Sequence, residues 1–130
     1  HARSVGDFQT DKARDAALAM FSGDDIPDAV FVSNDHMAFS VMDTLRFELE
    51  LRVPEDVSVV GYDDVLAASW RGYDLTTVRQ PAGQMVDKTV DILLAQIEDG
   101  NITPRRIEID GPLVVRSSAR CATSTKGSVR

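Results

Sequence analysis

Residues 57–61 (VSVVG) and residues 29–33 (AVFVS) decide the fold class of this chain of 130 residues. Both are apolar runs of strand length without the alternation of a half-exposed strand, and such runs are typical of parallel strands buried on both faces. Residues 75–79 (LTTVR) predict a third strand. Together they predict an α/β fold with a parallel sheet flanked by helices, in which residues 29–33 form a central strand.

Helical periodicity predicts the helices that flank this sheet. Apolar residues recur at spacings of three and four in three segments, which are residues 10–21, 36–51 and 84–99. Thr10 or Asp11 is expected to cap the first helix, and Asn34 and Asp35 are expected to cap the second. Weaker signals predict a strand at residues 4–8, a short helix at 67–71, and edge strands or one bent strand at 105–110 and 113–116.

Composition limits the partners of this chain. With 21 acidic and 14 basic residues the net charge is -7, so we expect no binding to DNA by this chain alone. Cys121 is the only cysteine, which excludes an internal disulfide and fits a reducing cytoplasm. No apolar run approaches the length that spans a membrane, so no membrane partner is expected. Because the chain begins at His1 without a methionine, we expect a fragment.

Enzymatic chemistry finds little support in the sequence. No glycine-rich phosphate loop follows a strand, and no serine or cysteine has a plausible base nearby. His36 has no second His, Cys or Glu at ligand spacing, so neither a metal site nor a catalytic triad is expected. The sequence therefore predicts a binding protein without catalytic residues, metal or cofactor.

Two motifs resemble signatures of LacI/GalR-type bacterial transcription regulators. Residues 27–38 (PDAVFVSNDHMA) are similar to the segment P-x-A-ψ-ψ-x-x-N-D-x-M-A, in which ψ is an apolar residue. Residues 52–64 (RVPEDVSVVGYDD) are similar to R-V-P-x-D-ψ-S-ψ-ψ-G-Y-D-D. Shorter matches lie at residues 6–8 (GDF), 75–81 (LTTVRQP) and 113–118 (LVVRSS).

The resemblance covers roughly residues 4–120 and implies a type-I periplasmic-binding-protein-like fold, in which two α/β lobes close over a ligand. Residues 1–120 are similar to most of the C-terminal lobe, with a crossover helix near 84–99, and residues 121–130 are expected to be a disordered tail. The DNA-binding headpiece, the N-terminal lobe, and the first strand and helix of the C-terminal lobe have no counterpart in this sequence. The implied function is cytoplasmic sensing of a sugar or nucleoside effector, with DNA bound only through that headpiece.

Asn34 and Asp63 follow the two strongest predicted strands, where parallel sheets place ligands. The residues alone leave Asn34 open between a helix cap and a ligand contact, and they leave Asp63 or Asp64 open as the cap of the next short helix. The resemblance implies that Asn34 and Asp63 contact the effector, while Asp35 and Asp64 are structural. Phe8 is either a core residue or an aromatic face that stacks on the effector, and the stacking role is favoured.

The resemblance also implies a homodimer with Phe39, Asp43 and Trp70 in its interface. A periplasmic sugar-binding protein of a transport system is the alternative, because such proteins share the fold and an Asn-Asp pair at the matching strand end. The segment at residues 75–81 and the sequence GYDD at residues 61–64 favour the regulator.

Overall fold

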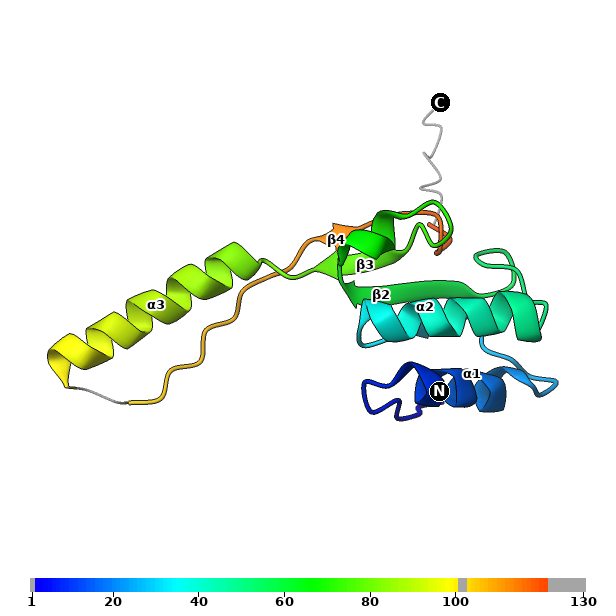
Figure 1. Ribbon diagram of the computed structural model, residues 1–130, viewed down its shortest axis with the longest axis horizontal. Coiled ribbons are helices and arrows are strands. Elements are labelled where there is room, and N and C mark those ends of the chain that lie inside the picture. The colour runs from blue at the N-terminus through cyan, green and yellow to red at the C-terminus, as the bar shows by residue number, and fades with distance from the viewer. Residues whose placement is uncertain (1, 101–102, 122–130) are drawn as a thin grey trace, which may run out of the picture.

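The sheet has four strands in the order β1-β2-β3-β4, and the first three are parallel (Figure 1). The computed structural model describes residues 2–100 and 103–121. Its elements are α1 (Thr10–Phe21), β1 (Ala29–Phe31), α2 (Asp35–Asp43), a π-helical segment (Thr44–Glu48), β2 (Ser58–Asp63), a 3-10 helix (Leu66–Ser69), β3 (Thr76–Arg79), α3 (Ala82–Asp99) and β4 (Leu113–Val114). The predicted α/β class and parallel sheet are confirmed.

β2 lies between β1 and β3 and pairs with both in the parallel direction. Val59 is opposite Val30 of β1, and Gly61 is opposite Thr77 of β3. β4 pairs with β3 in the antiparallel direction. Because the three parallel strands end at one edge of the sheet, the connections that follow them emerge side by side.

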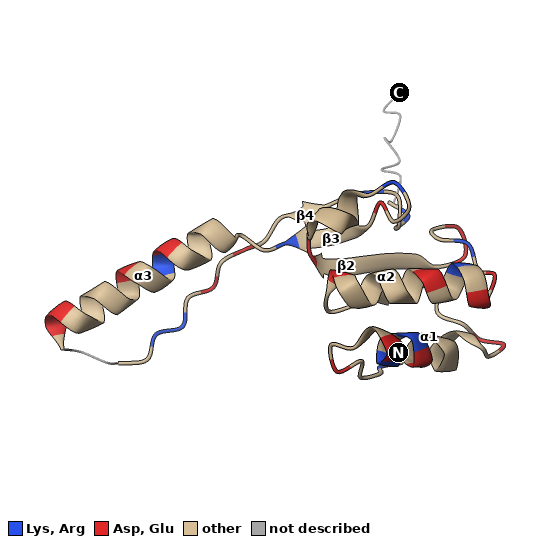
Figure 2. Ribbon diagram, viewed as in Figure 1, with Lys and Arg blue, Asp and Glu red and all other residues tan. Residues whose placement is uncertain are grey.

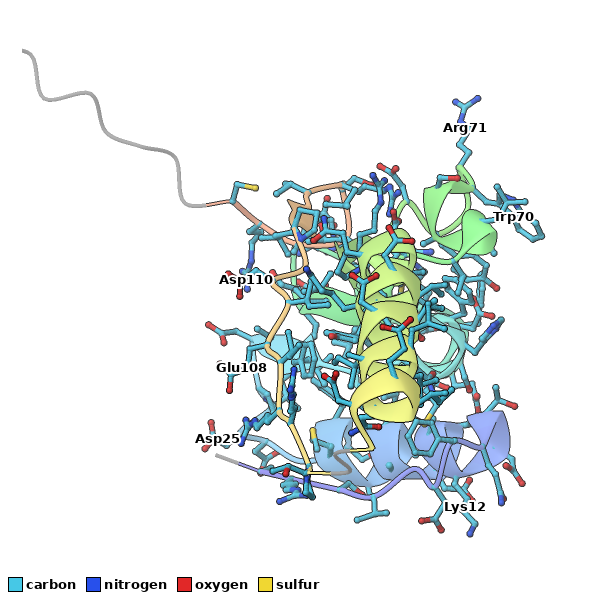
Figure 3. All side chains as sticks on the ribbon, turned by 90° about the vertical axis from the view of Figure 1, so that its left-hand side faces the viewer. Lys12, Asp25, Trp70, Arg71, Glu108 and Asp110 are labelled. Atoms are coloured by element: carbon cyan, nitrogen blue, oxygen red, sulfur yellow. The ribbon has the colours of Figure 1, made fainter. Side chains whose placement is uncertain are left out.

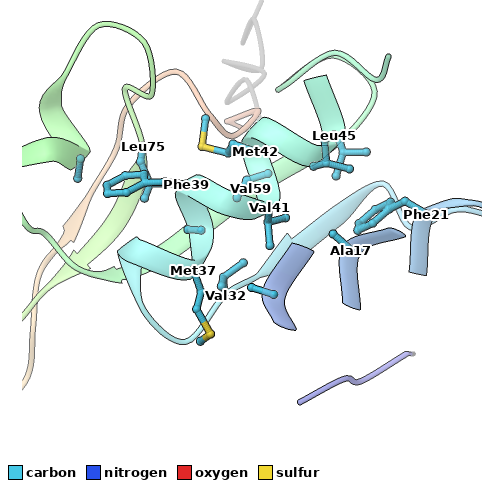
Figure 4. Close-up of a cluster of buried hydrophobic side chains, with 14 residues drawn as sticks. Ala17, Phe21, Val32, Met37, Phe39, Val41, Met42, Leu45, Val59 and Leu75 are labelled. Atoms are coloured by element: carbon cyan, nitrogen blue, oxygen red, sulfur yellow. The ribbon is translucent and has the colours of Figure 1, made fainter. Parts of the chain in front are cut away.

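The core is formed by α2, the sheet and α1, which packs beside α2 (Figure 4). Met42, Leu45, Val59 and Leu75 are fully buried in this cluster. Burial of each such side chain contributes roughly 1.5 to 3 kcal/mol to folding. The apolar periodicity of the sequence is thereby explained for α1 and α2, whose apolar faces meet in the core.

β1 lies at the edge of the sheet, so the prediction of a central strand at residues 29–33 was wrong. The strand covers only Ala29–Phe31, and the Phe31 side chain is 61% exposed. In the described part of the chain, no strand pairs with the outer edge of β1. An apolar run indicates a strand, but it does not show which neighbours lie beside it.

The segment before α1 is a turn, whereas the sequence predicted a strand at residues 4–8. Asp7 and Phe8 have φ angles of 48° and 56°, and these left-handed values interrupt an extended strand. The Gln9 amide donates to the Gly6 carbonyl at 2.8 Å and closes the turn.

The predicted helix caps are only partly correct. Asn34 caps α2 as predicted. Gln9 precedes α1 in place of the predicted Thr10 or Asp11, and it makes no side-chain cap hydrogen bond. Val65 precedes the 3-10 helix, again without a side-chain cap, because the Asp63 and Asp64 carboxylates bind other partners.

α3 and the segment that returns from it extend away from the sheet (Figure 1). The predicted helix at residues 84–99 is confirmed, and it ends at Gly100, whose φ of 65° is one that glycine adopts readily. No residue of α3 is buried. Residues 105–110 were predicted as an edge strand or as part of one bent strand. They form no strand and run back along α3 instead (Figure 1). The strand that follows them is confined to Leu113–Val114.

The predicted tail at residues 121–130 lies outside the described residues, apart from Cys121. Cys121 is exposed and free. Within the described ranges, no helix combines the length and the apolar character needed to cross a membrane.

Candidate functional site

Polar side chains gather at the edge where the three parallel strands end. Asn34 follows β1, Asp63 is the last residue of β2, and Gln80 follows β3. β2 carries almost no charge before this edge (Figure 2). Because ligands of parallel α/β sheets lie outside the carboxyl ends of the strands, this edge is the candidate site.

Asn34 is half-buried and caps α2. Its backbone is extended, with φ -154° and ψ 159°, and its Oδ1 accepts a hydrogen bond from the Met37 amide at 2.8 Å. No residue of the described ranges contacts its side-chain nitrogen through a hydrogen bond. The cap uses the oxygen, so the amide nitrogen remains available as a donor.

Asp63 lies at a strained bend at the end of β2. The φ angles of Asp63 and Asp64 are 126° and 57°, in a region that residues other than glycine rarely adopt. The Gln80 side-chain amide donates to Asp63 Oδ1, and the Gln80 backbone amide donates to the Asp63 carbonyl at 3.5 Å. As far as the chain is described, the second carboxylate oxygen has no hydrogen-bond partner and remains an acceptor.

Asn34 and Asp63 therefore offer a donor and an acceptor from neighbouring strand ends. Sugar hydroxyls donate and accept at once, and nucleobases present donors and acceptors side by side, so both complement this pair. A phosphate would face the negative charge of Asp63. The edge thus favours a neutral polar molecule over an anion.

Asp64 forms ion pairs with two chain segments, the end of β3, which leads out of the sheet to α3, and the segment that follows β4. Its side chain is 4% exposed and accepts from Arg79 at 2.6 Å and from Arg116 at 2.7 Å. Burial acts to raise the pKa of Asp64, but the hydrogen bonds and charges of Arg116 and Arg79 outweigh it, so the pKa lies below its usual value. Asp64 is therefore a structural anchor, which braces the crossing segments at the base of α3.

Asp35 is also a structural residue, as predicted, and it is fully buried. Its carboxylate accepts from the Val65 amide at 2.9 Å and from the Thr77 hydroxyl at 2.7 Å. These bonds join the start of α2 to the segment after β2 and to β3.

Phe8 lines a groove that the other two predicted effector residues do not line. Its side chain is 78% exposed, and it lines a groove of about 1140 Å³ between the N-terminal segment, α1 and β1. The groove includes Ser33 but neither Asn34 nor Asp63. The structure therefore brings Asn34 and Asp63 to one edge and leaves Phe8 beside it.

No role was predicted from the sequence for Gln80, Arg79 or Arg116. Gln80 could have been found, because it is a polar residue at the end of a predicted strand, like Asn34 and Asp63. With Tyr62 and residues of α3 it also lines a hollow of about 420 Å³. Arg116 carries no comparable signal, since its ion pair with Asp64 spans 52 residues of sequence.

The three residues predicted for a dimer interface differ in exposure. Phe39 is 8% exposed and stacks on Tyr73, with ring centroids 4.3 Å apart. The Tyr73 hydroxyl donates to Asp43 at 3.2 Å, and burial together with the Asp43 charge raises the pKa of Tyr73. Trp70 is 58% exposed and projects outward beside Arg71 (Figure 3). Trp70 thus presents the larger free surface, while Phe39 and Asp43 bind Tyr73 of the same chain.

The chemistry of the edge is hydrogen bonding. Within the part of the chain that the structure describes, the side chains of Asn34, Asp63 and Gln80 form no hydrogen bond with a serine, threonine or cysteine side chain that could act as a nucleophile. Across residues 2–100 and 103–121, no group of three His, Cys, Asp or Glu side chains could hold a metal ion. His36 packs edge-on to Phe39, with ring centroids 6.0 Å apart.

Comparisons with known proteins identify the family of this chain. The sequence model of the periplasmic binding protein-like domain matches residues 2–119. The chain is similar to the HTH-type transcriptional repressor PurR of Vibrio vulnificus (strain CMCP6), with 40% identity over 115 residues, which are 88% of this chain and 34% of the repressor. The chain thus spans about one third of the length of the curated relatives it matches.

Two solved structures are similar in both sequence and fold. The complex of the transcriptional regulator CelR with cellobiose has a TM-score of 0.77 and 35% identity, covering 89% of this chain and 35% of the regulator. The Lac repressor dimer bound to operator and the anti-inducer ONPF has a TM-score of 0.77 and 32% identity, covering 89% of this chain and 40% of the repressor.

Proposed function

This chain belongs to the periplasmic binding protein-like domain family, in the form found in LacI/GalR-type regulators, and on this premise we propose that it is the effector-binding part of a transcriptional repressor. The observation that carries the proposal lies at the carboxyl edge of the sheet: among the described residues, the Asn34 side-chain nitrogen and one Asp63 carboxylate oxygen have no hydrogen-bond partner. Such an edge binds a small polar molecule and has no group that would transform it, so we propose no enzymatic activity.

A neutral sugar or nucleoside is the proposed effector. Its hydroxyl or ring nitrogen groups would satisfy Asn34 and Asp63 together, whereas an anion would be repelled by the carboxylate. The similar regulator CelR is bound to cellobiose in its solved structure. Phe8 stays a proposed stacking partner, because its ring is exposed in the groove that begins at Ser33, next to Asn34.

Effector binding would act as a switch in a dimeric regulator. An effector that binds one lobe arrangement more tightly shifts the population toward it, and the dimer transmits that shift to the DNA-reading headpieces as a coupling free energy. The proposed interface contains Phe39, Asp43 and Trp70, and the similar Lac repressor is a dimer bound to operator. This chain, with its net charge of -7, would not bind DNA itself. A regulator of this kind works in the cytoplasm, where its operators are.

The alternative of a periplasmic sugar-binding protein is less favoured, because the similar proteins described above are transcriptional regulators. The coding sequence upstream of His1 separates the two functions directly. A helix-turn-helix would support the regulator, and a signal peptide would support the transport protein.

Trp70 provides a direct test of effector binding. It is the only tryptophan of the chain and ends the 3-10 helix that starts beside the Asp63–Asp64 bend. The protein would be titrated with mono- and disaccharides, nucleobases and nucleosides while Trp70 fluorescence is recorded. We expect a saturable response to one neutral compound and a much weaker one to its phosphorylated form. No response to any neutral compound, or a preference for the phosphorylated form, would contradict the proposal.

A further inference from the structure

The buried carboxylate of Asp35, which follows β1, connects the segment after β2 with Thr77 inside β3. Asp35 directly follows Asn34 and is the first residue of α2. Its Oδ2 accepts from the Val65 amide after β2, and its Oδ1 accepts from the Thr77 hydroxyl in β3. With 0% of its surface exposed, Asp35 cannot contact a ligand in solution.

The absence of a side chain at Gly61 leaves room for this carboxylate beside β2. A Cβ atom on Gly61 would lie 2.3 Å from Asp35 Oδ1 and 2.8 Å from Leu75 Cδ2. Gly61 is opposite Thr77 in the register of β2 and β3, so the carboxylate bridges the two strands two residues before β2 ends at Asp63. The start of α2 is thereby fixed at close range to both strands.

The bend at Asp63 and Asp64 needs such support. Its positive φ angles of 126° and 57° are strained, and strained backbone persists only where neighbouring contacts hold it. Asp35 holds the residue that follows the bend, Val65. Through Thr77 it also holds the strand that leads to Gln80, the partner of Asp63.

We propose, on the basis of the proposed effector function, that Asp35 is a positioning residue of the effector site. It keeps the Asp63 bend and β3 in one arrangement relative to Asn34, so that the donor and the acceptor face the same effector. Preorganisation of this kind raises affinity because the site does not have to be ordered when the ligand binds. Loss of one Asp35 bond loosens the bend and weakens effector binding, although every effector contact is still present.

Two adjacent threonines of β3 provide a matched test. Thr77→Val removes the hydroxyl that binds Asp35, and Thr77→Ser retains it. Thr76→Val is the control: it removes the hydroxyl of a second buried threonine in the same strand, but that hydroxyl bonds the Arg116 backbone at 2.9 Å. A purely structural role of the Asp35 bond predicts similar effects of Thr77→Val and Thr76→Val.

The first measurement uses the protein without effector. We expect hydrogen exchange of the Val65 amide to rise about tenfold in Thr77→Val, as for a weakened buried hydrogen bond, with a shifted NMR signal of the Gln80 side-chain amide. Thr76→Val and Thr77→Ser should leave both close to wild type. Equal changes in Thr77→Val and Thr76→Val, or no change in Thr77→Val, would overturn the proposal.

The second measurement is Trp70 titration with the neutral compound that the wild-type protein binds best. Affinity should fall about tenfold in Thr77→Val and stay within about twofold of wild type in Thr76→Val and Thr77→Ser. If Thr77→Val does not fold, Asp35→Asn replaces it, because it leaves one acceptor oxygen for two donors. Should the wild-type protein bind none of the neutral compounds, the proposed function fails, and the exchange of Val65 still decides whether Asp35 fixes the bend.

Discussion

At Gly61 the missing side chain lets the Asp35 carboxylate approach the backbone of β2. Gly61→Ala would place a methyl group 2.3 Å from that carboxylate and 2.8 Å from Leu75, so neighbouring atoms must move. We expect a loss of about 1 to 3 kcal/mol in the free energy of unfolding, measured by chemical denaturation. Gly72→Ala is the control, since apart from Gly72 and its two chain neighbours no described heavy atom lies within 4 Å of the new Cβ. Equal stability of the two variants would contradict the close packing at Gly61.

Asn34→Asp separates the two uses of the Asn34 side chain. The new carboxylate still accepts from the Met37 amide, so stability should change by less than about 0.5 kcal/mol. The donor nitrogen is lost, and effector binding should weaken by about 1 to 3 kcal/mol. Thermal denaturation and calorimetry would measure the two effects. Unchanged effector affinity would show that Asn34 is a helix cap alone.

Single residues of the candidate site were predictable where the signal was local. Asn34 and Asp63 each follow an apolar run, and this position places both at the carboxyl edge of the sheet. The partners that arrange them come from distant parts of the sequence, as with Thr77 and Asp35, which are 42 residues apart. A single sequence offers no periodicity from which such contacts can be derived.

At the scale of elements, the ion pairs of Asp64 hold the outgoing β3 and the incoming β4 segment. The pKa of Asp64 is lowered in the folded protein, so the Asp64 carboxylate stabilises the fold fully above about pH 3.8, the usual pKa of an aspartate. This stabilisation is lost as the pH falls through the pKa of Asp64 in the folded protein. Asp64→Asn should lower the free energy of unfolding by about 3 kcal/mol near neutral pH, because Arg116 then lacks its charged partner and its side chain is only 15% exposed.

Denaturation of wild type and Asp64→Asn at a series of pH values measures this contribution. The difference in unfolding free energy should be constant from pH 7 to pH 4 and shrink below pH 4. Asp56, whose pKa is lowered to about 2 by its hydrogen bonds with Arg52, titrates in both proteins, so its effect cancels in the difference. A difference that is independent of pH down to pH 2 would contradict the role of the Asp64 charge.

The elements themselves were predicted with uneven success. β2, β3, α1 and α3 follow from apolar runs and helical spacing, because their burial or amphipathic face depends on local sequence. The edge position of β1 and the turn at residues 4–8 could not be predicted in this way, because a strand forms only where a neighbouring strand completes its hydrogen bonds. Whether that neighbour is present is a property of the whole sheet.

For the whole molecule, the apolar stripe of α3 predicts self-association. Its exposed members are Val86 60%, Val90 47%, Leu93 52%, Leu94 53% and Ile97 77%. Each exposed apolar side chain forgoes roughly 1.5 to 3 kcal/mol of burial, so the stripe favours a partner surface. Sedimentation should detect dimers of this chain at tens of micromolar. A monomer under those conditions would contradict the prediction.

Variants at two surfaces would identify the part that associates. Val90→Gln combined with Leu94→Gln removes apolar surface from one face of α3, and Trp70→Ala removes the largest exposed side chain of the proposed dimer interface. If the dimer forms through the interface around Trp70, only Trp70→Ala should shift it toward monomer. If the dimer forms through exchanged α3 helices, the α3 double variant should shift it toward monomer.

Calorimetric titration of wild type and Asp63→Ala with the neutral compound identified through Trp70 fluorescence is the most direct test of an effector site at the carboxyl edge of the sheet. The account predicts saturable binding to the wild type, weakened by about 1 to 3 kcal/mol in Asp63→Ala because a charged acceptor is lost. Folding should survive, since the Asp63 side chain binds only Gln80 within the described residues. The same affinity in both proteins would contradict the account.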